Sequence, residues 1–119
     1  MVFGSNPIKD KLKEGDRCTP EGLFQIQDKY NHNSWSRFIW LNYPTKQSWN
    51  KHLKAKSEGR ISLLSSVGGQ VGIHGVPKDK DNWIEEKQNW TWGCISLKTN
   101  DIKEIYQFLG EGNTVEIIH

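Results

Sequence analysis

The apolar residues of this chain occur in short runs, each ended by glycine, proline or other turn-forming residues. In Gly22–Gln27, Phe24 and Ile26 alternate with neighbours that face the other way, which predicts a strand. The aromatic and β-branched run Arg37–Tyr43 predicts a second strand, which Pro44 ends. Runs of this length are typical of a domain made mainly of short strands and turns.

Further short segments add strands to this pattern, and residues 77–90 are expected to form a polar loop with one helical turn around Trp83. Alternation of residues over Gln70–His74 would place His74 on the face opposite Val71 and Ile73. Three segments are predicted as strands on this basis: Ile61–Leu64, Gln70–His74 and Thr114–Ile118.

Two helices are expected at the margins of the sheet. Thr45 is placed to cap a helix over residues 46–57, and the thin apolar stripe of that segment indicates a surface position. Thr99 or Asn100 is expected to cap a stronger helix, which Gly110 and Gly112 stop, because apolar residues recur between them at helical spacing. The sequence therefore predicts a mainly β domain with one or two peripheral helices.

Length and charge restrict the class of protein further. The chain has 119 residues, which is the length of one domain, and its six tryptophans add buried area that a 34% hydrophobic content alone would not supply. A net charge of +2 gives little support for a nucleic-acid partner, and the lysines of Lys9–Lys13 and Lys51–Lys56 are expected to lie on solvated faces. No apolar stretch reaches membrane-spanning length, and no signal peptide is recognisable.

Cys94 and His74 form the candidate reactive pair. His74 precedes Cys94 by twenty positions, and Gly93 stands directly before the cysteine. A thiol becomes a competent nucleophile near neutral pH when an imidazole can take its proton, and a glycine lets backbone approach the reacting centre closely. The plainer interpretation is a buried small apolar cysteine and a structural histidine.

Cys18 is the other cysteine. A disulfide between the two is the alternative, but two free thiols are expected because a bridge would block the nucleophile.

Four segments of the chain occur in an order that is recognisable. They are Gly15–Gly22 (GDRCTPEG), Ser36–Pro44 (SRFIWLNYP), Ile73–Gly75 (IHG) and Asn89–Leu97 (NWTWGCISL). Together they resemble the L,D-transpeptidase catalytic domain family (YkuD-type), in particular its YafK-like murein transpeptidase branch. The resemblance covers about residues 4 to 118 and includes the closing helix and strand.

The resemblance implies a β-sandwich-like L,D-transpeptidase catalytic fold in which residues 1–119 form a single domain. Strands that usually precede the Gly-Asp motif of the family are expected to be missing. The implied activity is that of a cysteine acyltransferase. Cys94 would attack the third residue of a peptidoglycan stem peptide and expel the terminal D-alanine, with His74 as general base and then general acid. The thioester would pass to an amine.

Other reactions remain open at this point. Transfer of the thioester to water would make the domain an L,D-carboxypeptidase or a hydrolase that releases a protein attached to the wall. A small thiol peptidase acting on other peptides would use the same residues. A non-catalytic peptidoglycan-binding module that keeps the fold is the alternative from another class.

The resemblance also implies roles for residues around the pair. The backbone carbonyl of Gly75 would hold the imidazole, and the backbone N–H groups of Trp92, Gly93 and Cys94 would meet the oxyanion. Trp92 replaces a histidine found in many members, a change expected to tune the fit of the substrate. Three side chains are candidates for substrate contact, each with a structural role as the alternative: Thr91, Tyr43 and Ser96.

No metal ion and no organic cofactor is implied. His32, His52 and His119 do not form a metal-binding set with either cysteine. The expected partners are peptidoglycan stem peptides, with a wall-anchored lipoprotein as a further candidate, and the domain is expected to be monomeric. Such a substrate implies an extracytoplasmic location, in the periplasm or cell wall.

Overall fold

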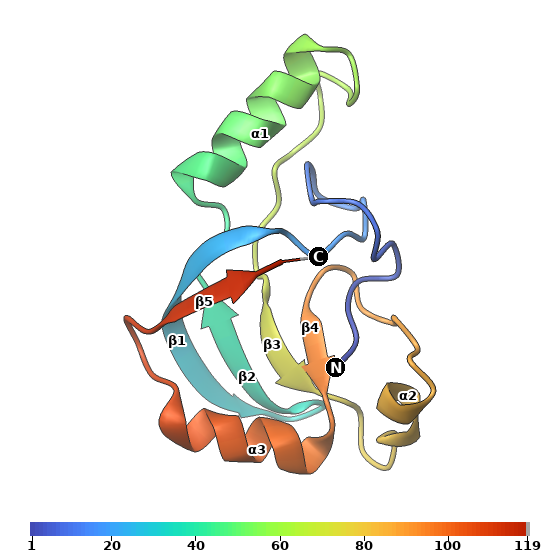
Figure 1. Ribbon diagram of the computed structural model, residues 1–119, viewed down its shortest axis with the longest axis vertical. Helices are drawn as coiled ribbons and strands as arrows, with labels where there is room; N and C mark the ends of the chain where they lie inside the picture. Colours follow the sequence, from blue (N-terminus) through green and yellow to red (C-terminus); the bar gives the residue numbers. More distant parts are fainter. Residues whose placement is uncertain (119) are drawn as a thin grey trace.

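The two strands with the clearest sequence patterns form the centre of the sheet in the computed structural model, which describes residues 1–118 (Figure 1). Strands β1 (Gly22–His32) and β2 (Ser36–Leu41) pair as an antiparallel hairpin. A bulge between Ile26 and Asp28 bends β1, and the first part of this strand pairs with β5 (Thr114–Ile117) instead. β1 therefore curls the sheet.

The remaining strands extend the sheet beyond β2. Strand β3 (Gly72–Gly75) is antiparallel to β2, and β4 (Ile95–Leu97) is parallel to β3, which gives the order β4-β3-β2-β1-β5. The N-terminal segment runs beside β4 and is bridged to it through Val2 and Ser96 (Figure 1). The first residues of the chain thus meet residues of β4 at this edge of the sheet.

Helix α1 (Lys46–Ser57) confirms the expected helix, including its cap. The Ser48 N–H donates to Thr45 Oγ1 at 3.2 Å, and the Thr45 N–H donates to Ser48 Oγ at 3.1 Å, so both groups form a capping box. α1 projects away from the sheet, and His52 Nδ1 donates to the Leu12 carbonyl at 2.6 Å (Figure 1). This hydrogen bond ties α1 to the N-terminal segment.

The core lies between the sheet and α3 (Thr99–Phe108), with the single helical turn α2 (Asn82–Glu85) at the side (Figure 1). Ile102 of α3 is fully buried against a row of aliphatic residues from successive strands. That row comprises Ile39, Ile73 and Ile95. The opposite face of the sheet carries Tyr30, Phe38, His74 and Ser96. His74 therefore does lie opposite the aliphatic residues, as alternation predicted.

The mainly β fold with peripheral helices is confirmed, but one predicted strand is wrong. Residues 61–64 form bends and turns, and the Leu63 and Leu64 side chains are 75% and 95% exposed. This segment follows α1 at the end distant from the sheet, where no strand is available for pairing (Figure 1). Within residues 1–118, no helix is long and apolar enough to cross a membrane.

Candidate active site

Cys94 and His74 lie on neighbouring parallel strands. His74 pairs with Ser96, and Cys94 stands two residues before Ser96, directly ahead of β4. Residues two apart along a strand point to the same face, so Cys94 and His74 share the face that does not contact α3. Gly72 stands one residue before Ile73 on β3, just as Cys94 stands one residue before Ile95, the pairing partner of Ile73. Because glycine has no side chain, Gly72 places none between the thiol and the imidazole.

The His74 imidazole is held in one tautomer. Its Nδ1 lies 2.7 Å from the Gly75 carbonyl, which can only accept a hydrogen bond, so Nδ1 carries the hydrogen and Nε2 keeps its lone pair. Burial lowers the pKa of His74 to about 4, against the opposing effect of the bond to Gly75. The ring is therefore a neutral base at pH 7.

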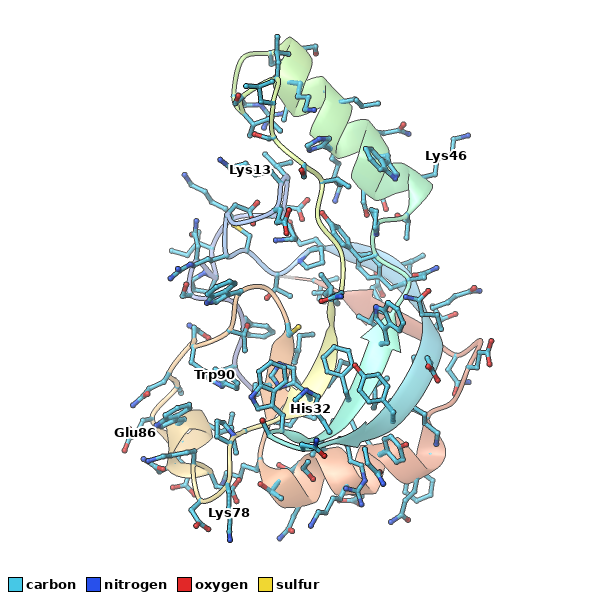
Figure 2. All side chains as sticks on the ribbon, turned by 180° about the vertical axis from the view of Figure 1, so that it is seen from behind. Lys13, His32, Lys46, Lys78, Glu86 and Trp90 are labelled. Atoms are coloured by element: carbon cyan, nitrogen blue, oxygen red, sulfur yellow. The ribbon has the colours of Figure 1, made fainter. Side chains whose placement is uncertain are left out.

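Three aromatic rings enclose this imidazole. Its ring centre is 4.2 Å from that of Trp35, 5.7 Å from that of Phe38 and 5.4 Å from that of Trp90. His32 stacks on the far side of Trp35, at 4.5 Å. Figure 2 shows aromatic side chains gathered between the labelled Trp90 and His32. The enclosure leaves His74 1% exposed, which excludes water and fixes the ring orientation.

Stability is expected to fall by about 3 kcal/mol between pH 7 and pH 4 through His74 alone. The pKa of His74 is lowered from 6.5 to about 4 in the folded protein, so the unfolded chain binds a proton that the folded state resists. Because the unfolded state binds more protons in this window, stability rises with pH across it. Urea unfolding of the wild type and of His74→Gln at both pH values isolates the contribution, because carboxylates titrate in both. Equal pH dependence of the two proteins would contradict it.

The Cys94 thiol is protonated near neutral pH. Burial of the sulfur raises the pKa of Cys94, while a hydrogen bond from the Gly72 N–H and the positive charge of Lys11 oppose this rise. The thiol donates to the Gln70 carbonyl at 3.6 Å. The resting site thus holds a protonated thiol and a neutral imidazole on the same face, and the thiol needs a base to form the thiolate.

The loop before Cys94 is shaped by Gly93. Its φ of +149° suits glycine, and a Cβ at this position would lie 2.9 Å from the Cys18 carbonyl oxygen. Thr91 Oγ1 donates to the Cys94 carbonyl at 2.6 Å and accepts from the Gly93 N–H at 3.3 Å. Trp92 points into solvent with 74% of its side chain exposed, and Arg17 lies over the ring at 5.2 Å.

The three candidate substrate contacts are all buried, and each hydroxyl bonds to a backbone carbonyl. Ser96 Oγ donates at 3.3 Å to the same Gly75 carbonyl that His74 uses. The Tyr43 hydroxyl donates to the Val67 carbonyl at 2.9 Å, and Thr91 bonds within its own loop. In this conformation these hydroxyls position the strands and loops around the pair.

The expectation that the lysines of residues 9–13 are solvated is wrong for Lys11. Its side chain is 5% exposed, and its ammonium pairs with Asp16 at 3.0 Å. A short lysine-rich run has the composition of a solvated surface. Whether one of its lysines is buried depends on the segments that pack over it, and for Lys11 these include the loop before Cys94. The only feature of the sequence that pointed to a buried, paired Lys11 was Asp16, a member of the Gly-Asp motif.

The two cysteines are free thiols, with Cys18 buried, so the disulfide alternative is not realised in this structure. Among residues 1–118, no group of three or more His, Cys, Asp or Glu side chains is placed to hold a metal ion. Cys94 and His74 remain the candidate reactive pair on this face. Sequence reasoning missed the aromatic rings around His74 because their contacts join distant parts of the chain.

The fold brings a thiol and a neutral imidazole to the same face of two neighbouring strands. A model of the L,D-transpeptidase catalytic domain (YkuD) matches residues 2–117, and the chain therefore belongs to this family. Domains of this family act on peptidoglycan in the cell wall, which lies outside the cytoplasm.

Solved structures share the same fold. The helical cell shape determining protein Pgp2 from Campylobacter jejuni superposes with a TM-score of 0.69 and 24% identity, covering 97% of this chain and 35% of that one. Bd1075 from Bdellovibrio bacteriovorus has a TM-score of 0.60 and 16% identity, over 92% of this chain and 36% of the other. The chain thus spans about a third of the length of these proteins. No curated protein matches the chain.

Proposed function

We propose that this domain is a cysteine-dependent L,D-transpeptidase that acts on peptidoglycan stem peptides. One observation carries the proposal: Cys94 and His74 share a face of neighbouring strands, and the bond from Nδ1 to the Gly75 carbonyl leaves Nε2 as the free base. Membership of the L,D-transpeptidase catalytic domain family supports peptidoglycan as the substrate. Likeness to a protein that determines helical cell shape agrees with a substrate in the wall.

The proposed reaction has two acyl transfers. The Cys94 thiol turns from the Gln70 carbonyl toward His74, whose Nε2 takes the proton while sulfur attacks the carbonyl carbon of the third stem residue. The bond to the terminal D-alanine then breaks, and His74 returns the proton to the leaving amine. An amine from a second stem peptide attacks the thioester, gives its proton to His74 and restores the thiol.

Backbone N–H groups of the nucleophile loop are the proposed oxyanion donors. Trp92, Gly93 and Cys94 supply them, and such donors contribute on the order of 3 kcal/mol each in acyl-transfer sites. The Gly93 N–H is bonded to Thr91 Oγ1 at a long 3.3 Å, so it can move to the oxyanion at small cost. The exposed Trp92 ring is free to contact the substrate on the outer side of the loop.

Acylation of Cys94 by a carbapenem tests the nucleophile, and the expected result is one covalent adduct per chain. The strained lactam carbonyl takes the place of the stem-peptide carbonyl, so the same thiol should attack it. Intact-mass analysis and peptide mapping locate the adduct, with Cys18→Ser as the matched control because it keeps Cys94 and should still be acylated. A folded, reduced protein without an adduct, or with an adduct on Cys18 alone, would contradict the proposal.

The acceptor is read from the products formed on purified sacculi. Cross-linked stem peptides joined through the third residue support transpeptidation, with an amine as acceptor. Trimmed tripeptides without cross-links identify an L,D-carboxypeptidase, and release of a wall-anchored lipoprotein identifies the corresponding hydrolase. Binding of sacculi with an unchanged muropeptide profile would instead support a non-catalytic wall-binding module, and would overturn the enzymatic proposal.

A further inference from the structure

A buried positive charge lies beside the nucleophile loop. The Lys11 ammonium is 3.5 Å from the point where a Cβ on Gly93 would lie, and Gly93 is the residue directly before Cys94. Lys11 comes from the N-terminal segment, whose first residues are bridged to the stretch around β4 through Val2–Ser96 and Gly4–Thr91. Further along this segment, the labelled Lys13 lies close to α1 in Figure 2. The 5% exposure of Lys11 means that little water separates this charge from the loop. The ammonium is therefore the buried cationic group beside the loop, whereas Arg17 lies over the exposed Trp92 ring.

Asp16 holds this lysine in place. One carboxylate oxygen accepts from Lys11 Nζ at 3.0 Å and from the Cys18 N–H at 3.1 Å. The other oxygen accepts from the Leu12 N–H at 2.8 Å and the Lys13 N–H at 3.2 Å. Burial opposes ionisation, but these bonds outweigh it and lower the pKa of Asp16. The carboxylate is thus a fixed anchor that also closes the loop of residues 12–18.

Stability is a poor explanation for burying this pair. Lysine is rarely buried this deeply, and a buried ion pair often contributes no more to stability than apolar residues of the same volume would. Asp16 already accepts three backbone N–H groups, so the anchor does not depend on the lysine for its hydrogen bonds. Because Lys11 lies beside the nucleophile loop, its buried charge can act on the chemistry of Cys94.

We propose that Lys11, anchored by Asp16, is a positioning residue whose ammonium stabilises the negative charge that forms on the Cys94 sulfur during attack. The inference rests on the proposed function in that Cys94 is the nucleophile. Lys11 makes no covalent bond and transfers no proton, since His74 is the base. Its charge acts across the buried Gly93 backbone, where it is screened less than it would be in bulk water.

The charged and titratable groups around the sulfur support an electrostatic role. Lys11 lowers the pKa of Cys94, which burial raises, and His74 on β3 is neutral at pH 7. Of the other carboxylates on the segment, Asp10 is bonded to Lys51 at 2.6 Å and Glu14 is exposed to solvent. Lys11 is thus the full positive charge that favours the thiolate at neutral pH.

The test is the pH dependence of Cys94 alkylation by iodoacetamide, followed by mass spectrometry of the Cys94 peptide. Lys11→Met is expected to slow the reaction about three- to tenfold at pH 7 and to leave the rate at high pH unchanged, because only the thiolate fraction changes. Lys11→Arg keeps the charge and should restore most of the rate. Lys9→Met removes an exposed lysine of the same segment and serves as the matched control.

Asp16→Asn should change the alkylation rate in the direction opposite to Lys11→Met. This difference distinguishes an effect of charge from an effect of altered structure. The Asp16→Asn substitution leaves the Lys11 ammonium uncompensated, so alkylation at pH 7 should be faster than in the wild type. A purely structural role predicts that Lys11→Met and Asp16→Asn both change the rate in the same direction at every pH. That outcome would overturn the proposal. So would pH profiles of the alkylation rate that have the same inflection point for Lys11→Met and the wild type. If Lys11→Met does not fold, the comparison of Lys11→Arg and Asp16→Asn with the wild type decides.

This experiment uses no wall substrate, so its failure is distinct from failure of the proposed function. A carbapenem adduct on Cys94 together with an unshifted Lys11→Met profile would refute the role of Lys11 and leave the transpeptidase proposal standing. A shifted profile without any acyl adduct would refute the transpeptidase proposal and retain the electrostatic coupling.

Discussion

Replacing His74 with glutamine is expected to slow carbapenem acylation of Cys94 by about 10²- to 10⁴-fold, the usual contribution of a general base. Burial raises the pKa of Cys94, so the thiol stays protonated at neutral pH, and the neutral His74 ring is the base placed to remove its proton. Glutamine can still donate to the Gly75 carbonyl, which preserves the local hydrogen bond while removing the base. Stopped-flow or mass-spectrometric acylation rates at pH 7 measure the effect.

His32→Gln is the matched control for this variant. His32 stacks on the other side of Trp35, and its Nδ1 accepts from the Ser34 and Trp35 N–H groups, each at 3.1 Å. Its replacement removes a second imidazole from the same aromatic stack without touching the base, so acylation should change by less than about threefold. A loss of similar size in both variants would show that the stack matters only for packing, and would remove His74 from the mechanism.

Adding one methyl group at Gly72 is expected to cost about 2–4 kcal/mol of unfolding free energy and to disable the site. A Cβ there would lie 2.4 Å from the Ile39 carbonyl oxygen and 2.5 Å from the Phe38 ring, distances that require strands β2 and β3 to separate. The Gly72 N–H also bonds to the Cys94 sulfur, so movement of this strand would displace the nucleophile from His74. Urea unfolding and the rate of acylation measure the two effects.

Gly69→Ala provides the comparison for Gly72→Ala. A Cβ at Gly69 meets nothing within 4 Å, so this change in the same stretch of chain should alter stability by less than about 1 kcal/mol. If Gly72→Ala were as stable and as reactive as Gly69→Ala, the sheet would have to accept a side chain at that point. The account of how Cys94 and His74 are brought together would then be wrong.

Local chemistry made several elements predictable from the sequence. Thr45 and Ser48 form the cap of α1 within four residues of one another, so the bounds of that helix depend on neighbours in the chain. The pattern around His74 likewise predicted its face, because strand alternation is a local property. Motif order identified the family, which the match over residues 2–117 confirms.

Other features depended on pairing between distant segments. The stretch Ile61–Leu64 has the composition of a strand but meets no sheet edge, and β4 is a strand of three residues that exists through its pairing with β3. A strand needs hydrogen-bonding partners from elsewhere in the chain, whereas a helix supplies its own. Apolar composition alone therefore overestimates strands in one place and misses them in another.

The sequence by itself determined the family and the main elements and supplied two candidate reactive side chains, because these follow from residue type and local spacing. The tertiary structure alone decided the state of the site. It packs Trp35 and Trp90 around His74, which makes the imidazole a neutral base, and it buries Lys11 against the loop that carries Cys94. Burial and proximity set pKa values and charge stabilisation, and both arise only when segments distant in the chain pack together.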